Sequence, residues 1–260
     1  MKGQFVFLGT GGSMGVPMIG CKCPVCTSSS PKDKRWRTSG LLTIDGKNIL
    51  IDCGPDFREQ ALKNEIDSLD GVIITHAHND HIAGIDELRA YLLSRNTPMP
   101  CLMSSKTSDD LHLRFDYIFL PKDHKERLIP KISPVIFPGS EGKIDFLGLE
   151  IRYFTYLQAG MAVIGLRIGN FAYLTDIKDY TDSIFPFLEG VETLVVSALR
   201  YAPSHLHFCV EEAVQFSKKT SAKETWLTHI SHELSHDGIN ASLPPTIRPA
   251  YDGLKIDILG

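Results

Sequence analysis

Three histidines and one aspartate lie within six residues of the chain, between His76 and His81. His76 and His78 are two residues apart, so in an extended backbone their side chains point to the same side. Asp80 and His81 follow directly, and the four side chains can form two half-sites that face each other. Imidazole nitrogen and carboxylate oxygen together suit zinc, manganese or iron. The stretch therefore predicts a metal centre rather than a polar turn with surface histidines.

Three cysteines also lie within six residues, at Cys21, Cys23 and Cys26. Thiolates so spaced, on a loop that Pro24 bends, can converge on one zinc ion. A structural zinc site has four ligands, so the fourth must come from a distant part of the chain. The alternative interpretation is three unpaired buried thiols.

The elements that position these residues follow from apolar runs. The run at residues 71–74 predicts a buried strand that ends at the histidines, and Asp45-Gly46 between two apolar runs predicts a hairpin. The glycine-rich turn at residues 9–13 is predicted to line the rim of the site, because it lacks the third glycine of a dinucleotide fingerprint. We expect strands at 4–8, 41–44, 48–51, 101–104, 144–147, 149–156, 161–168, 171–176, 193–199, 225–228 and 254–259, and helices at 56–66 (with Asp56 as N-cap), 82–94, 109–119, 182–188 and 210–217.

Two polar segments are expected to be exposed: residues 27–38, which are rich in lysine and arginine, and the stretch that contains His236 and Asp237.

Composition limits the class of protein. Hydrophobic residues make up 43% of the 260 residues and charged residues 22%, which is ordinary for a globular chain. The net charge of -4 gives no overall basic footprint for nucleic acid. No apolar run approaches the roughly 18 residues of a membrane span, and the start does not resemble a leader. We therefore expect a cytoplasmic protein without membrane contact, whose six cysteines are ligands or core residues rather than disulfides.

The pattern His-x-His-x-Asp-His after an apolar strand resembles the metallo-β-lactamase superfamily. This resemblance implies a hydrolase with a four-layered αββα sandwich (an α/β fold) and metals at its edge. The Gly-Cys-x-Cys-x-x-Cys insert is similar to that of a subgroup that includes the phosphodiesterase of bacterial phosphonate breakdown, which opens five-membered cyclic ribosyl phosphates. Matching motifs run from residue 9 to residue 253. They imply a single domain over residues 1–260, with a zinc-binding insert near 20–38 and a variable insert near 98–138.

The resemblance also implies roles for residues outside the two clusters. Asp176 would bridge two metals, and His207 would protonate the leaving oxygen, with His205 as the second choice. Asp52 would orient a ligand histidine, although a strand-end cap is an equal alternative. The implied ligands are His76, His78 and Asp176 for the first metal, Asp80, His81, Asp176 and His229 for the second, and Cys21, Cys23, Cys26 and His232 for a structural zinc.

One position departs from the family pattern. The family often has Leu-x-His-Gly where this chain has Leu157-Gln158-Ala159-Gly160, and that histidine is normally a third ligand of the first metal. A methyl group cannot bind a metal, and the amide oxygen of Gln158 is a weaker ligand than imidazole. We therefore expect the first site to be weak or vacant.

The leading hypothesis is a metal-dependent phosphodiesterase with two divalent ions (zinc or manganese) in the active site and one structural zinc. A metal-bound hydroxide would attack a small or cyclic phosphodiester, with Asp80 and His207 as the catalytic residues. A ribonuclease of the transfer RNA 3′-end type is an alternative, disfavoured because no long basic arm is evident. The second alternative is a metal-binding protein that Ala159 has weakened as a catalyst. A homodimer is compatible with the sequence.

Overall fold

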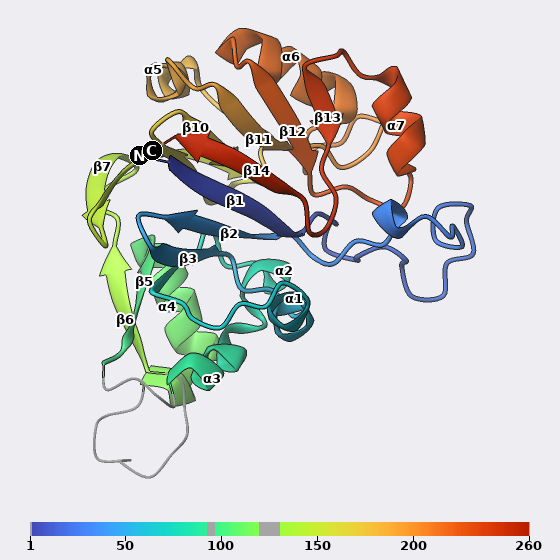
Figure 1. The fold of residues 1–260 in the computed structure, drawn as a ribbon. Helices are drawn as coiled ribbons and strands as arrows, with labels where there is room; N and C mark the ends of the chain where they lie inside the picture. The colour runs from blue at the N-terminus through green and yellow to red at the C-terminus, as the bar shows by residue number, and fades with distance from the viewer. Residues whose placement is uncertain (1, 93–96, 120–130, 260) are drawn as a thin grey trace.

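Two sheets of seven strands form the centre of the computed structural model, which describes residues 2–92, 97–119 and 131–259 (Figure 1). The strand order is β14-β1-β2-β3-β4-β5-β6 in the first sheet and β13-β12-β11-β10-β9-β8-β7 in the second. The strands are β1 (Lys2–Gly9), β2 (Ser39–Ile44), β3 (Lys47–Ile51), β4 (Gly71–Ile73), β5 (Met99–Met103), β6 (Ile132–Ile136), β7 (Glu141–Phe146), β8 (Leu149–Gln158), β9 (Met161–Ile168), β10 (Phe171–Leu174), β11 (Thr193–Ser197), β12 (Glu224–Thr228), β13 (Ile247–Pro249) and β14 (Lys255–Leu259).

Helices cover the outer face of each sheet. The first sheet carries α1 to α4 and the second carries α5 to α7 (Figure 1). Their bounds are α1 (Phe57–Lys63), α2 (Asn79–Ile82), α3 (Arg89–Leu92), α4 (Ser105–Arg114), α5 (Phe185–Leu188), α6 (Val210–Thr220) and α7 (His236–Ser242), with short 3-10 helices η1 (Pro31–Asp33), η2 (Ile85–Leu88), η3 (Asp116–Phe119) and η4 (Asp182–Ile184). None of these helices is long and apolar enough to cross a bilayer.

Apolar side chains fill three layers. The central layer lies between the two sheets, where Phe5 of β1 packs on Phe171 and Tyr173 of β10. Each such ring stabilises the fold by about 1.5–3 kcal/mol. The other two layers lie between each sheet and its helices. The predicted αββα sandwich is confirmed.

Parallel strands bring the polar strand ends to one edge. β3 to β6 run parallel to one another, and so do β10 to β13. Ligand sites in sheets of this kind lie beyond the carboxyl ends of parallel strands. Two backbone hydrogen bonds link the second sheet to the first at this edge of the sandwich. The N–H of Ile164 donates to the carbonyl oxygen of Thr75, and the N–H of Ile230 donates to that of Thr10.

The predicted helix at residues 82–94 is wrong as a continuous element. The chain there forms the end of α2, then η2 and α3, and residues 93 and 94 lie outside the described part. The interruption follows from packing, because the backbone N–H of Gly84 donates to Cys53 and a Cβ at Gly84 would lie 2.0 Å from the carbonyl oxygen of Gly54. Only glycine allows the chain after His81 to approach the turn after β3 this closely.

Other boundaries also differ from the predictions. α1 is shorter than residues 56–66, and the Asp56 side chain does not cap it but accepts a hydrogen bond from the backbone N–H of Arg37. α4 begins four residues earlier than expected, where Ser104 accepts from the backbone N–H of Thr107. β6, β13 and α7 were not predicted. The segment at 98–138 contains β5, α4, η3 and β6, while its residues 120–130 lie outside the described part.

The expectation that residues 27–38 and His236 are exposed is wrong for four residues, Asp33, Arg35, Thr38 and His236, which are all buried. Arg35 is only 2% exposed. The Arg35 guanidinium donates to Thr10 Oγ1 and to the carbonyl oxygen of Ala250, both at 2.7 Å, and lies 3.3 Å from His236 Nδ1. Asp33 accepts a hydrogen bond from the backbone N–H of His236. These contacts fasten the cysteine-rich insert to the C-terminal part of the chain.

Candidate metal centre

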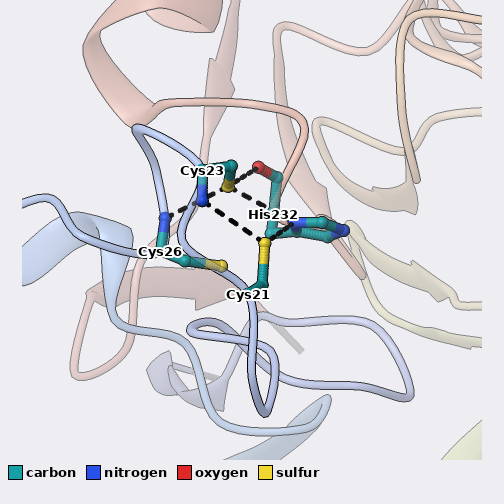
Figure 2. A group of neighbouring side chains, drawn as sticks. All are labelled: Cys21, Cys23, Cys26 and His232. Atoms are coloured by element: carbon teal, nitrogen blue, oxygen red, sulfur yellow. Dashed lines mark hydrogen bonds between the residues drawn. The ribbon is translucent and has the colours of Figure 1, made fainter.

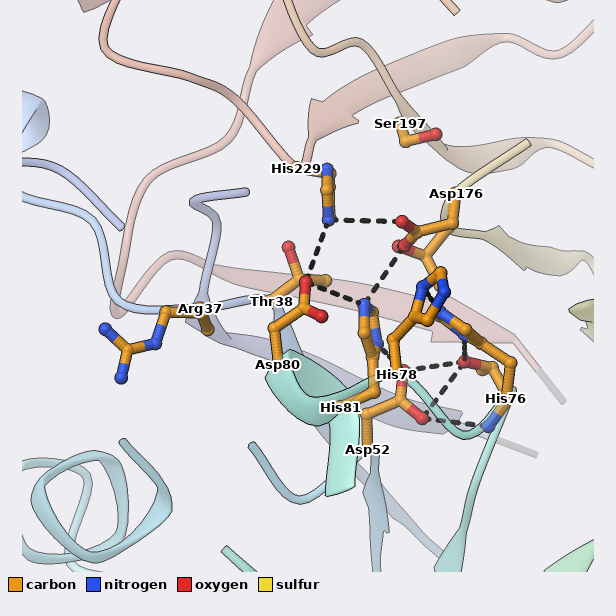
Figure 3. A network of polar contacts seen from close by, with 12 residues as sticks. Arg37, Thr38, Asp52, His76, His78, Asp80, His81, Asp176, Ser197 and His229 are labelled. Atoms are coloured by element: carbon orange, nitrogen blue, oxygen red, sulfur yellow. Dashed lines mark hydrogen bonds and ion pairs between the residues drawn. The ribbon is translucent and has the colours of Figure 1, made fainter. Parts of the chain in front are cut away.

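Side chains from four strand ends converge at one edge of the sandwich (Figure 3). Asp52 follows β3, the histidine-rich stretch follows β4, Asp176 follows β10 and His229 follows β12. Asp52, Asp176 and His229 have φ angles of 62°, 57° and 57°, in the left-handed region that non-glycine residues rarely adopt. Backbone strain of this kind persists where surrounding contacts hold the residue, and it gathers at functional sites.

Asp80, His81 and His229 form one buried group with Asp176 beside it. His81 Nε2 lies 3.4 Å from Asp80 Oδ2 and 3.1 Å from Asp176 Oδ2, and His229 Nε2 lies 3.4 Å and 3.2 Å from the same two carboxylates (Figure 3). Burial lowers the pKa of His81, but the carboxylates of Asp176 and Asp52 raise it well above its ordinary value. The group therefore attracts positive charge.

The donor atoms of this group fit a divalent cation. Ligand bonds of about 2.0–2.2 Å place neighbouring tetrahedral ligand atoms about 3.3–3.6 Å apart, close to the separations seen here. His81 Nε2 is buried and has no hydrogen-bond partner, although two carboxylates face it. A cation between these atoms would satisfy all of them.

His76, His78 and Asp176 form another group, at the predicted first metal site. Their donor atoms lie within 4.8 Å of one another. His76 Nε2 is 3.0 Å from His78 Nδ1. Ala159 lines the cavity that opens over both groups, and its methyl side chain offers no ligand atom. This group therefore has two imidazoles where the family pattern has three. It shares Asp176 with the group formed by Asp80, His81 and His229.

Asp52 lies behind the histidines and holds them in place. Its carboxylate accepts hydrogen bonds from His81 Nδ1 at 2.7 Å, from the backbone N–H of Thr75 and from the Thr75 hydroxyl, which also lies 3.0 Å from His76 Nδ1. A carboxylate on the far nitrogen of a ligand histidine fixes the ring and its tautomer. These contacts favour the orienting role of Asp52 over that of a simple strand-end cap.

Of the two histidines before α6, only His207 faces the cavity. His205 is exposed, whereas His207 is buried, with Nδ1 at 3.3 Å from Asp176 Oδ1 and its ring stacked on His229 at 4.8 Å. Burial and the neighbouring His229 lower the pKa of His207 to about 4, against the opposing pull of Asp176.

A cavity of about 450 Å³ opens over these groups. Its lining includes Ser13 from the glycine-rich turn that was expected at the rim, and three side chains that sequence reasoning missed: Asn79, Met161 and Leu206. Asn79 could have been noticed as part of the histidine motif, but nothing local marks the other two. Larger hollows of about 620 and 710 Å³ lie elsewhere on the molecule, away from every candidate ligand.

The cysteine-rich insert forms a separate group with His232 (Figure 2). His232 Nδ1 lies 3.4 Å from both Cys21 Sγ and Cys23 Sγ, while Cys26 Sγ accepts a hydrogen bond from the backbone N–H of Met18. The backbone N–H of Cys26 and the His232 ring lower the pKa of Cys23 to about 6, so this thiol readily becomes the thiolate that binds zinc. Three thiols and one imidazole are the donor set of a closed structural zinc site.

Comparison with known proteins agrees with this geometry. Residues 47–230 match the family model of the beta-lactamase superfamily domain. A solved structure described as a new diphosphatase from the PhnP family is 37% identical, with a TM-score of 0.92 over 99% of this chain and 98% of that one. Among curated proteins, the octanoyltransferase of Porphyromonas gingivalis is 36% identical over 253 residues, and the chain spans only 50% of its length. The ribonuclease Z of Borrelia recurrentis is 22% identical over 296 residues, covering 87% of this chain and 92% of that protein.

The sequence motif, the two-sheet sandwich and the family match point to the same assignment. The predicted superfamily is confirmed, and the likeness to the PhnP-family structure extends over nearly the whole chain. The chain belongs to the metallo-β-lactamase superfamily, in its PhnP-like subgroup.

Proposed function

We propose that the chain is a phosphodiesterase that hydrolyses small or cyclic phosphodiesters. The observation that carries this proposal is the arrangement of two candidate metal groups that share Asp176, beneath a cavity with His207 on its wall. The similarity to a diphosphatase of the PhnP family supports phosphoryl chemistry.

Each residue has a part in this reaction. Two divalent ions, zinc or manganese, would supply Lewis-acid activation of water and neutralise phosphoryl charge. Asp80, His81, Asp176 and His229 would hold one ion, and His76, His78 and Asp176 the other. His207, which lines the cavity, would hand a proton to the departing alkoxide from its protonated form, which its pKa of about 4 makes a small fraction at neutral pH. Asp52 would keep His81 in the tautomer that directs Nε2 to the ion.

The cavity favours a small substrate with a single negative charge. Its volume of about 450 Å³ suits a molecule of drug or nucleotide size. No lysine or arginine stands among its described lining residues, so the ions alone would neutralise the substrate. A phosphodiester carries one charge, which such a site neutralises more easily than the two or more charges of a terminal phosphate.

Cys21, Cys23, Cys26 and His232 would bind the structural zinc. This ion would hold the insert near residues 20–38 beside the segment that carries His229, since His232 is three residues further on. Metal binding at such a site contributes directly to folding.

Transfer RNA processing is the weaker alternative, although ribonuclease Z is among the similar proteins. A site for RNA would need cationic side chains that follow the phosphate backbone, whereas the net charge is -4 and the described cavity lining has no such side chain. The other alternative, a metal-binding protein without turnover, depends on whether Ala159 has disabled the first site.

Hydrolysis of bis(p-nitrophenyl) phosphate by the manganese- or zinc-loaded protein tests the proposal. We expect metal-dependent turnover, and a loss of about 10²–10⁴-fold in kcat for Asp80→Ala, because this variant removes a carboxylate that faces both His81 and His229. Exposed Asp109→Ala is the matched control and should keep the parent rate. Metal-loaded parent protein that hydrolyses no phosphodiester would favour the inert alternative.

Restoring a histidine at position 159 should strengthen the first metal site. Ala159 has a φ of 47°, a conformation that histidine tolerates better than most residues, and it borders the cavity beside His78. We expect Ala159→His to retain a second active-site ion through dialysis against a weak chelator and to raise kcat by about tenfold. Ala162→His places an extra histidine on the exposed face of β9 and is the control. Equal metal retention in all three proteins would contradict the prediction.

A further inference from the structure

Arg114 links helix α4 to the histidine-rich stretch. It is the last residue of α4, which begins at the Ser104 cap and packs Leu111 into the layer between the first sheet and its helices. One guanidinium nitrogen, Nη1, donates to the carbonyl oxygen of Ala77 at 2.6 Å and to Asn79 Oδ1 at 3.3 Å. Both acceptors are uncharged, so these two contacts leave the positive charge of Arg114 uncompensated.

The contact with Arg114 fixes the direction in which the Asn79 amide faces. A guanidinium only donates hydrogen bonds, so the amide atom that meets it must be the oxygen. The amide nitrogen Nδ2, on the other arm of the same planar group, then points away from Arg114. Asn79 lines the cavity over the metal groups, whereas Arg114 does not. Nδ2 therefore has two N–H groups to offer to a molecule in that cavity, and no acceptor in the described part of the chain takes them.

Asn79 lies between the two candidate metal groups along the chain. Its neighbour His78 belongs to one group and its other neighbour, Asp80, belongs to the other. The Asn79 side chain is exposed at the cavity wall, while its backbone is held in α2, where its carbonyl oxygen accepts from the N–H of Ala83. Since an amide nitrogen donates but does not accept, it can contact a substrate here without competing for the ions.

An N–H donor beside such ions suits an anionic oxygen. When a nucleophile attacks a phosphodiester, negative charge is spread over the non-bridging oxygens of the phosphoryl group. A fixed donor aimed at one of these oxygens stabilises the transition state. The guanidinium on the other side of the amide polarises it, which makes the N–H groups stronger donors.

We propose that Asn79 is a substrate-binding residue whose Nδ2 donates a hydrogen bond to one non-bridging phosphoryl oxygen, and that Arg114 is the positioning residue that aims it. This inference rests on the proposed function and adds to it a phosphoryl contact that the chain itself supplies. Arg114 acts through Asn79 and makes no contact with the phosphoryl group.

The first test uses methyl 4-nitrophenyl phosphate and the two enantiomers of its phosphorothioate, in which sulfur replaces one or the other non-bridging oxygen. Sulfur is a weak hydrogen-bond acceptor. We expect Asn79→Ala to lower kcat/KM by about 10- to 100-fold for the oxygen ester and for one enantiomer, but by less than about threefold for the enantiomer whose sulfur faces Asn79. Asn240→Ala, exposed on α7, is the matched control and should match the parent for all three esters.

Metal content and thermal midpoint are measured for every protein. An unchanged kcat/KM in Asn79→Ala, or equal losses for the three esters, would overturn the contact. Loss of an ion from Asn79→Ala would also overturn it, because the residue would then support the metal groups rather than the substrate.

The second test concerns Arg114. We expect Arg114→Met to lower kcat/KM for the oxygen ester by about tenfold, and Arg114→Lys, which keeps a charged donor, to stay within about threefold of the parent. In the Asn79→Ala background, Arg114→Met should have no further effect. Arg58→Met, which removes an exposed arginine paired with Glu59, is the control. Losses that multiply in the double variant would show that Arg114 acts through Ala77 on the histidine-rich stretch instead.

Binding of inorganic phosphate separates this inference from the proposed function, because it needs no turnover. In titration calorimetry of the zinc-loaded protein, we expect the Kd of phosphate to rise by about tenfold in Asn79→Ala and to stay within about twofold of the parent in Asn240→Ala. If the parent shows this difference but hydrolyses no phosphodiester, the proposed function fails and the Asn79 contact is retained. Equal Kd values in the parent and Asn79→Ala, or a parent that binds no phosphate, would refute the contact.

Discussion

Asp176→Asn should strip both ions from the active site and lower phosphodiester hydrolysis by about 10³-fold or more. Asp176 is the one carboxylate that belongs to both candidate groups, with Oδ1 toward His229 and Oδ2 toward His81. Burial raises the pKa of Asp176, yet the imidazoles of His229 and His81 hold it well below its ordinary value, so it is fully ionised at neutral pH. A neutral amide removes that charge from a site where five histidines face few carboxylates.

Asparagine is the right replacement because it removes the negative charge of Asp176 without adding backbone strain. Asp176 has a φ of 57°, and asparagine tolerates this region as well as aspartate does. Metal content by mass spectrometry and kcat are the two measurements. Asp179→Asn, three residues further on and exposed, should keep both ions and the parent rate. An Asp176→Asn protein with full metal content and a rate within tenfold of the parent would show that Asp176 is not the shared ligand.

The sequence was most informative where short-range patterns carry the information. A buried strand followed at once by His-x-His-x-Asp-His defines both an element and the chemistry at its end, and the sandwich followed from the family resemblance. Asp176 and His229 could be proposed only through that resemblance, because a lone polar residue after a strand is usually part of a turn. The structure brings all of these side chains to one edge.

Contacts between distant segments were beyond the reach of the sequence. Arg35 and His236 are 201 residues apart and both sit in polar stretches, so their burial against each other left no local signal. The pairing of Gln158 with His207, 49 residues apart, depends on how the β8–β9 hairpin meets the loop before α6. The broken helix after His81 has a similar cause, since Gly84 is pressed against Gly54 and tertiary packing outweighs helical periodicity.

His232→Ala should release the structural zinc and lower the thermal midpoint by about 10 °C, while kcat falls by less than about tenfold. Zinc at sites of this kind contributes to folding outright, and part of that contribution is lost with one ligand. A loss of about 3–5 kcal/mol corresponds to such a shift for a chain of this size. The insert would still be fastened through Arg35, which is buried on Thr10 and Ala250, so we expect destabilisation rather than complete unfolding.

The active site should tolerate this loss because His229 is held independently of the zinc. The next residue, Ile230, donates its backbone N–H to Thr10 and accepts from the backbone N–H of Gly12, and neither bond involves the insert. Zinc content, thermal midpoint and kcat are measured together, with exposed His205→Ala as the control that should match the parent in all three. Full zinc content with an unchanged midpoint would show that His232 is not the fourth ligand. A collapse of kcat at an unchanged midpoint would mean that the zinc group shapes the catalytic edge directly, and that the segment from His229 to His232 transmits its effect.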